Sequence, residues 1–126
     1  MDHLVLEYIK EQPTSLRNVY NHVFHKLSGL KAQLPRLTNV HFVASGSSLN
    51  ASYAARFYWE SLVCPTHVWD PLEFTLRMEK GLISSDSTII AVSQSGQSSA
   101  AIDAAKTARE MGLTTIGVTA GEASPL

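Results

Sequence analysis

The alternation of short apolar segments with helix-like segments, from residue 40 onward, most constrains how this chain can fold. The apolar segments are rich in β-branched residues and lack the polar alternation of a strand with one wet face. Segments with the apolar spacing of helices, at 49–63, 72–80 and 99–111, lie between them. The pattern predicts an α/β fold, a three-layer sandwich around a parallel, doubly wound sheet. Its four expected strands are Val40–Ala44, Thr66–Trp69, Thr88–Val92 and Thr114–Val118.

A long helical pattern precedes the first strand. Its apolar residues recur at helical spacing, at Leu16, Val19, Tyr20, Val23, Phe24, Leu27, Leu30 and Leu34. We expect a short helix over 4–10, a break at Pro13, and a long helix that ends at Pro35. We therefore expect a single domain over 1–126, with an N-terminal helical segment at 1–37 and a parallel α/β core at 38–126. The last residues, 124–126, are typical of a connection to a further element, so we expect the domain to be truncated.

Composition excludes several classes of protein. The chain has 126 residues, of which 44% are hydrophobic and 17% charged, which fits an ordered globular domain. A net charge of −1 gives no basic surface for nucleic acid or a membrane, and no apolar run approaches the ~20 residues of a membrane span. The lone cysteine, Cys64, fits a reducing compartment. We expect a cytoplasmic protein that binds neither nucleic acid nor membrane.

The segment Ser93-Gln94-Ser95-Gly96-Gln97-Ser98, called the serine loop here, follows the third expected strand and precedes a helix. Amides of a first helical turn lack partners within the helix, and the helix dipole favours negative charge there. Serine hydroxyls can join these amides, while one glycine lets the backbone approach a ligand. An ordinary capped turn is the structural alternative. We predict a phosphate site at Ser93, Gln94, Ser95 and Ser98.

A second segment, Ser45-Gly46-Ser47-Ser48, follows the first expected strand. In a parallel sheet both segments lie at the carboxyl edge, where α/β folds bind ligands. Ser47 and Ser48 are therefore predicted to join the same site. The glycine spacing fits neither a dinucleotide fingerprint nor a nucleotide P-loop, and no Gly-x-Ser-x-Gly hydrolase elbow is present. An FMN site of the flavodoxin type is the strongest rival, although its phosphate loop normally follows the first strand.

The remaining polar residues give no catalytic pair. His22 and His25 lie off the apolar stripe, so a solvated face is expected rather than a metal site. His41 and Cys64 are expected to be packed structural residues. Glu73, at the start of a short helix, is the one carboxylate that could approach the site. No cofactor and no metal are predicted, and the catalytic residues stay unknown.

The sequence resembles the SIS (sugar isomerase) domain family, most closely the first of two such domains in the isomerase part of glucosamine-6-phosphate synthase and its relatives. The resemblance rests on Glu11-Gln12-Pro13, Gly46-Ser47-Ser48, the run Arg-Phe-Tyr-Trp-Glu-Ser-Leu at 56–62, Glu73-Phe74 and the serine loop. Two positions differ from the family pattern. Gln97 stands in place of the usual Glu, and Ser98 in place of the usual Thr.

The resemblance implies a five-stranded parallel sheet, whose fifth strand would lie beyond Leu126, and a homodimer. It also implies that the serine loop binds the phosphate of a sugar phosphate, with Ser47 and Ser48 against the sugar. In the synthase-like members, the acid and base residues come from a second SIS domain and a C-terminal tail. We therefore expect the phosphosugar-binding half of an aldose–ketose or amino-sugar-phosphate isomerase, which by itself lacks the catalytic acid and base residues. A non-catalytic sugar-phosphate sensor is the alternative.

Overall fold

The computed structural model of the chain describes residues 2–30, 37–62, 64–121 and 123–126. The chain divides into two compact units, Met1–Pro35 and Arg36–Leu126. In the first unit a single helix, α1, runs over Asp2–Leu30 with Pro13 inside it. The expected break at Pro13 is therefore wrong. Proline removes one backbone hydrogen bond from a helix, and here the helical residues on both sides continue past that gap. The expected end at Pro35 lies outside the described residues.

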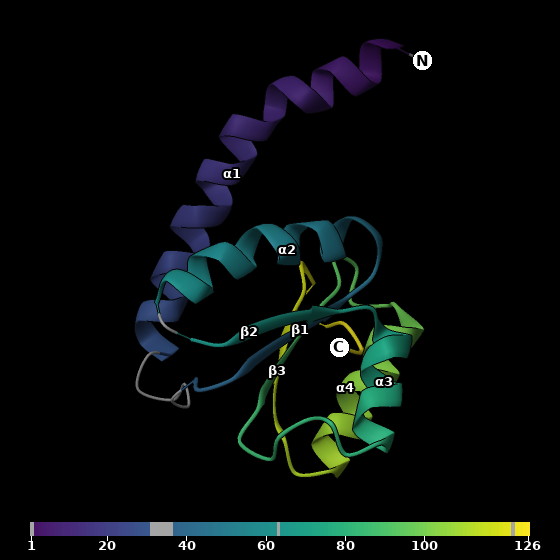
Figure 1. Ribbon diagram of the computed structural model, residues 1–126. Coiled ribbons are helices and arrows are strands. Elements are labelled where there is room, and N and C mark those ends of the chain that lie inside the picture. The colour runs from purple at the N-terminus through teal and green to yellow at the C-terminus, as the bar shows by residue number, and fades with distance from the viewer. Residues whose placement is uncertain (1, 31–36, 63, 122) are drawn as a thin grey trace. The chain divides into compact units, whose positions relative to one another are not determined.

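The second unit contains a four-stranded sheet in which every pair of neighbours is parallel (Figure 1). The strands are β1 (Val40–Ala44), β2 (Thr66–Trp69), β3 (Thr88–Val92) and β4 (Thr114–Val118). Their order across the sheet is β2-β1-β3-β4. All four strands lie where the sequence predicts them, and the α/β prediction is confirmed.

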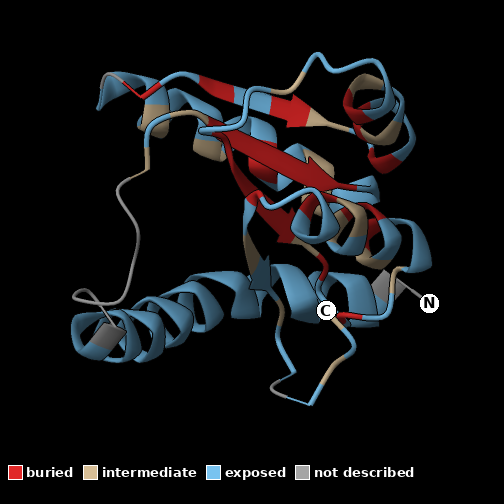
Figure 2. Ribbon diagram, turned by 90° about the horizontal axis from the view of Figure 1, so that it is seen from below, coloured by how far each residue is buried: buried red, intermediate tan, exposed pale blue. Residues whose placement is uncertain are grey.

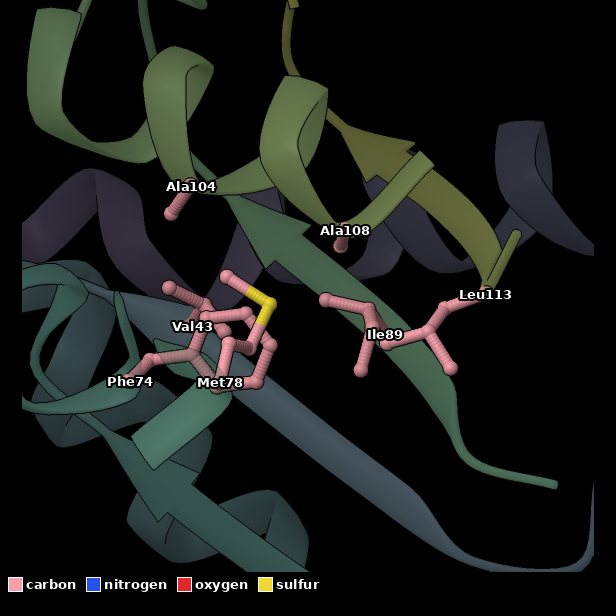
Figure 3. Packing of buried hydrophobic residues seen from close by; sticks show 7 residues of the cluster. All are labelled: Val43, Phe74, Met78, Ile89, Ala104, Ala108 and Leu113. Carbon is pink, nitrogen blue, oxygen red and sulfur yellow. The ribbon is translucent and has the colours of Figure 1, made fainter. Parts of the chain in front are cut away.

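Three helices cross between these strands and cover both faces of the sheet. They are α2 (Gly46–Ser61), α3 (Pro71–Glu79) and α4 (Ser99–Glu110). On one face, α2 packs against a cluster that includes Val40, Phe42 and Ile90. On the other face, α3 and α4 pack together over Val43 and Ile89 (Figure 3).

Successive side chains of a strand point to opposite faces of the sheet. Because helices cover both faces, the side chains on both sides of β1 and β3 are buried, and the two segments are therefore largely apolar throughout. Both are buried along almost their whole length, whereas the edge strand β4 is mostly exposed (Figure 2). Phe74 of α3 is fully buried between the layers. Burial on both faces of the two central strands fixes the sheet, and with it the position of every loop at its carboxyl edge.

A polar network is buried on the α3 and α4 side of the sheet. Trp69 Nε1 donates a hydrogen bond of 2.9 Å to His41 Nδ1, so the neutral imidazole carries its proton on Nε2. That nitrogen lies 3.2 Å from Ser87 Oγ, which also accepts from Asn39 Nδ2 at 3.2 Å. The His67 ring stacks on His41 at a centroid distance of 4.8 Å. The expectation that His41 is a structural residue with its hydrogen bonds satisfied is confirmed.

Candidate functional site

The two serine-containing segments meet at the carboxyl edge of the sheet because their strands are neighbours. Ala44, the last residue of β1, pairs with Val92, the last residue of β3. From this point α2 leads to β2 on one side, and α4 leads to β4 on the other. Strand order therefore reverses between β1 and β3, the place where open α/β sheets form a binding crevice. The topology brings all six predicted site residues to this one edge.

The serine loop is a tight turn built on its own backbone. The Ser93 amide donates to the Val118 carbonyl at 3.0 Å, and the Ser93 carbonyl accepts from the Gly96 amide at 3.1 Å. Ser95 Oγ accepts from the Gln97 amide at 3.2 Å. These bonds shape the loop without using the Ser93 or Ser98 hydroxyl. Both hydroxyls lack a hydrogen-bond partner among the residues that the structure describes.

Gly96 occupies the one position in this loop that only glycine fits. Its φ is +66°, in the left-handed region that L side chains rarely adopt. A β-carbon there would lie 2.7 Å from Thr119 Oγ1 and would also clash with the Ser124 side chain. Glycine is thus required by conformation and by space.

Two of the helix starts at this edge, those of α2 and α4, lack a side-chain cap. Ser45 is the N-cap residue of α2 and Ser98 that of α4, and neither side chain makes a capping hydrogen bond. By contrast, Asp70 caps α3, where its Oδ1 accepts from the Leu72 amide at 3.0 Å. The alternative of ordinary capped turns is therefore wrong for both serine segments. Their first-turn amides remain available to an acceptor from outside.

The predicted site residues differ in exposure. Gln94, Ser95 and Ser47 are exposed, while Ser48 and Ser98 are partly buried. Ser93 is buried, with 6% of its surface exposed. Helix α2 begins at Gly46 and not near residue 49 as expected, so Ser47 and Ser48 belong to its first turn rather than to a loop. Gly46, the first residue of this helix, does not contribute to the apolar spacing, so the spacing alone places the start of the helix too late.

Helices α2 and α3 each carry an ion pair between side chains one turn apart. Arg77 Nη2 lies 2.9 Å from Glu73 Oε1, and its guanidinium carbon lies 4.0 Å from the centre of the Trp69 ring. Arg56 Nε lies 2.7 Å from Glu60 Oε1. Glu73 therefore has a local structural partner. In the described part of the chain, no cluster of three or more His, Cys, Asp or Glu could hold a metal ion.

Sequence reasoning missed a third segment at the same edge, here called the post-β4 segment (residues 119–121 and 123–126). Thr119 and Ser124 of this segment lie against Gly96. The signal was present, because both residues follow a strand of the same parallel sheet. A cavity of about 530 Å³ lies elsewhere, between α4, β4 and the end of the chain, and includes Lys106 and Arg109 in its lining. None of the six predicted site residues lines it.

Fold and site together define a class: a parallel α/β domain with uncapped helix starts and hydroxyl-bearing turns at the switch point of its sheet. The family described as SIS domain matches residues 36–126, and the chain belongs to this family. The described residues contain no helix long and apolar enough to cross a membrane.

Relatives and solved structures agree with this assignment. The isomerizing glutamine–fructose-6-phosphate aminotransferase of Haemophilus influenzae is 33% identical over 87% of this chain and 19% of its own length. That of Methanococcus maripaludis is 25% identical over 90% of this chain and 18% of its own. The chain thus spans about a fifth of the length of these curated relatives.

Two structures show the same fold. A candidate phosphosugar isomerase from Clostridium difficile matches with a TM-score of 0.79 and 17% identity, over 95% of this chain and 34% of that one. The C-terminal domain of glucosamine-fructose-6-phosphate aminotransferase from Francisella tularensis matches with a TM-score of 0.61 and 19% identity, over 71% of this chain and 25% of that one. The predicted likeness to this group of SIS domains is confirmed.

Proposed function

We propose that this SIS domain binds the phosphate group of a sugar phosphate at the carboxyl edge of its sheet. The observation that carries the proposal is the pair of uncapped helix starts, α2 and α4, on either side of the strand-order switch. An anion there would accept hydrogen bonds from amides and hydroxyls, each worth about 1.5–3 kcal/mol when one partner is charged. No lysine or arginine is required.

In this proposal the six predicted residues divide into two groups. Ser93, Gln94, Ser95 and Ser98 surround the phosphate, and the exposed hydroxyl of Ser47 with that of Ser48 faces the sugar. Gly96 gives the loop a left-handed turn, and turns of this kind can direct successive backbone amides toward one anion. The names of the relatives, which act on fructose 6-phosphate, support a hexose 6-phosphate or an amino-sugar phosphate as the ligand.

We further propose that the chain by itself binds this ligand without turning it over. Isomerisation needs a base placed beside the carbon-bound proton, and the candidate carboxylate of Glu73 is held by Arg77. The parent activity would be that of an aldose–ketose isomerase or an aminotransferase of the synthase type. A sugar-phosphate sensor would begin with the same binding step.

A homodimer in the cytoplasm is also proposed. The outer side of α2 exposes large apolar side chains, at Tyr53, Phe57, Tyr58 and Leu62. Such a patch on a soluble domain marks an interaction surface. Cys64 is a buried free thiol, which is compatible with a reducing compartment.

Calorimetric titration with fructose 6-phosphate and glucose 6-phosphate tests the proposed binding site. Ser98→Ala removes one hydroxyl that has no partner among the described residues, and we expect the dissociation constant to rise about tenfold. Ser61→Ala, at the other end of α2, serves as the matched control and should bind like the wild type. Lack of binding by a folded wild-type protein at millimolar ligand would overturn the proposal, as would equal binding by Ser98→Ala.

A further inference from the structure

The post-β4 segment lies across the serine loop and supplies hydrogen-bond donors to it. Thr119 Oγ1 and the Ala120 amide both donate to the Gln94 carbonyl, at 3.4 and 3.0 Å. The Leu126 amide donates to the Gly96 carbonyl at 3.2 Å. Two carbonyls of the serine loop are therefore engaged by a segment that is distant in sequence.

These two contacts matter because a carbonyl oxygen carries partial negative charge and repels an anion, whereas an amide N–H attracts one. A loop of six residues carries both kinds of group, and it can bind phosphate only when its carbonyls point elsewhere. The donors of the post-β4 segment hold the Gln94 and Gly96 carbonyls toward that segment. The amides of Gln94, Ser95 and Ser98 remain without a partner among the described residues.

Close packing ties the same two segments together. Thr119 Oγ1 and the Ser124 side chain occupy the space in which a side chain at position 96 would lie. The Thr119 hydroxyl also accepts from the Gly121 amide at 3.3 Å. Thr119 thus holds the turn of its own segment and reaches the serine loop with a single hydroxyl.

We propose that the post-β4 segment is a positioning element that keeps the serine loop in its anion-binding conformation, with Thr119 as its central residue. The inference rests on the proposed phosphate site and deepens it. Thr119 acts through the Gln94 carbonyl and does not have to touch the ligand. Loss of its hydroxyl removes one of the two donors to that carbonyl and leaves only the Ala120 amide, which should weaken binding of any phosphate ester, whichever sugar carries it.

Calorimetric titration of three variants with fructose 6-phosphate tests this inference. Thr119→Val keeps the shape but removes the hydroxyl, and a lost hydrogen bond of about 1 kcal/mol predicts a roughly fivefold higher dissociation constant. Thr119→Ser retains the hydroxyl and should restore affinity to within about twofold of the wild type. Thr115→Val is the matched control, because Thr115 Oγ1 makes a comparable bond to the Leu113 carbonyl at 3.1 Å, on β4 but away from the loop.

The outcomes separate the two claims. Wild-type protein that fails to bind would overturn the phosphate site and this inference together. If the wild type binds and Thr119→Val binds equally well, only the positioning role is overturned. A purely structural role would lower the unfolding midpoint of Thr119→Val and Thr115→Val alike and leave both affinities unchanged. Binding that weakens in Thr119→Val and returns in Thr119→Ser would support the positioning role.

Discussion

At the scale of single residues, His41 is a buried titratable group whose pKa lies well below its ordinary value. Burial and, to a smaller extent, the charge of nearby His67 together lower the pKa of His41 from 6.5 to about 4, against the opposing effect of Asp86. Protonation would also set a new N–H against the indole N–H of Trp69. The folded state therefore holds this ring neutral.

We predict that this histidine makes the fold sensitive to acid. Because the folded pKa lies below the unfolded value, its contribution is complete above pH 6.5 and is lost as the pH falls toward 4. The shift from 6.5 to about 4 corresponds to about 3 kcal/mol of unfolding free energy. Urea denaturation at several pH values should show this loss. His41→Asn keeps an acceptor for Trp69 but does not titrate, so it should flatten the profile between pH 6.5 and 4. An unchanged profile would contradict the assignment.

Gly96 gives a second prediction at the residue scale. Gly96→Ala places a β-carbon in a left-handed backbone conformation and against Thr119 and Ser124, and both effects destabilise the fold. Gly81 has the same φ of +66° but nothing within 4 Å of a β-carbon, so Gly81→Ala isolates the backbone term of about 1 kcal/mol. We expect Gly96→Ala to lose about 1–3 kcal/mol more than Gly81→Ala in chemical denaturation. Equal losses would show that the contact with the post-β4 segment is not tight.

At the scale of elements, a change at the start of α4 is expected to stabilise the fold and to weaken phosphate binding. Ser98→Asp would place a carboxylate at an empty N-cap, where it can accept amide hydrogen bonds and complement the helix dipole. We predict that the fold gains about 0.5–1 kcal/mol while phosphate binding is lost, because the new charge occupies the anion's place. Thermal unfolding and calorimetric titration measure the two effects. Retained affinity in the more stable variant would place the ligand elsewhere.

Element boundaries also show what sequence can and cannot predict here. The strands were predictable because β1 and β3 are buried on both faces, and short runs of β-branched and other apolar residues are typical of such strands. Two residues misled the helix predictions: α1 continues through Pro13 despite its preference for a break, and α2 begins at Gly46, whose φ of +59° lies in the left-handed region. Parallel topology alone predicts that the six site residues lie at one edge of the sheet.

The contacts of the post-β4 segment were not predictable in the same way. The Thr119 bond to the Gln94 carbonyl and the pairing of His41 with Trp69 join residues far apart in sequence. No spacing rule within one element encodes such bonds, because they depend on the register of three strands. These bonds follow only from the three-dimensional arrangement of the strands.

At the scale of the whole molecule, the proposed homodimer would use the exposed apolar side chains of α2. Phe57 and Tyr58 are exposed by 75% and 67%. A net charge of −1 adds little repulsion between copies. These residues are well placed for a self-complementary patch.

We predict that Phe57→Ser with Tyr58→Ser converts a dimer into a monomer. Multi-angle light scattering would then show the mass of one chain in place of two. Leu82→Ser removes an equally exposed apolar side chain from a loop after α3, and should leave the mass unchanged. A wild-type protein that stays monomeric across concentration would rule out the proposed homodimer.

The all-parallel sheet also has a consequence for how quickly the domain forms. No two neighbouring strands are joined by a hairpin, and each pairing must close a loop that contains at least one whole helix. The conformational entropy of that closure is lost before the pairing contributes any stability. Helices such as α4 can form early from local contacts, whereas the pairing of β1 with β3 must await the arrival of a distant segment. We therefore expect the edge on which the serine loop lies to form late in the folding reaction.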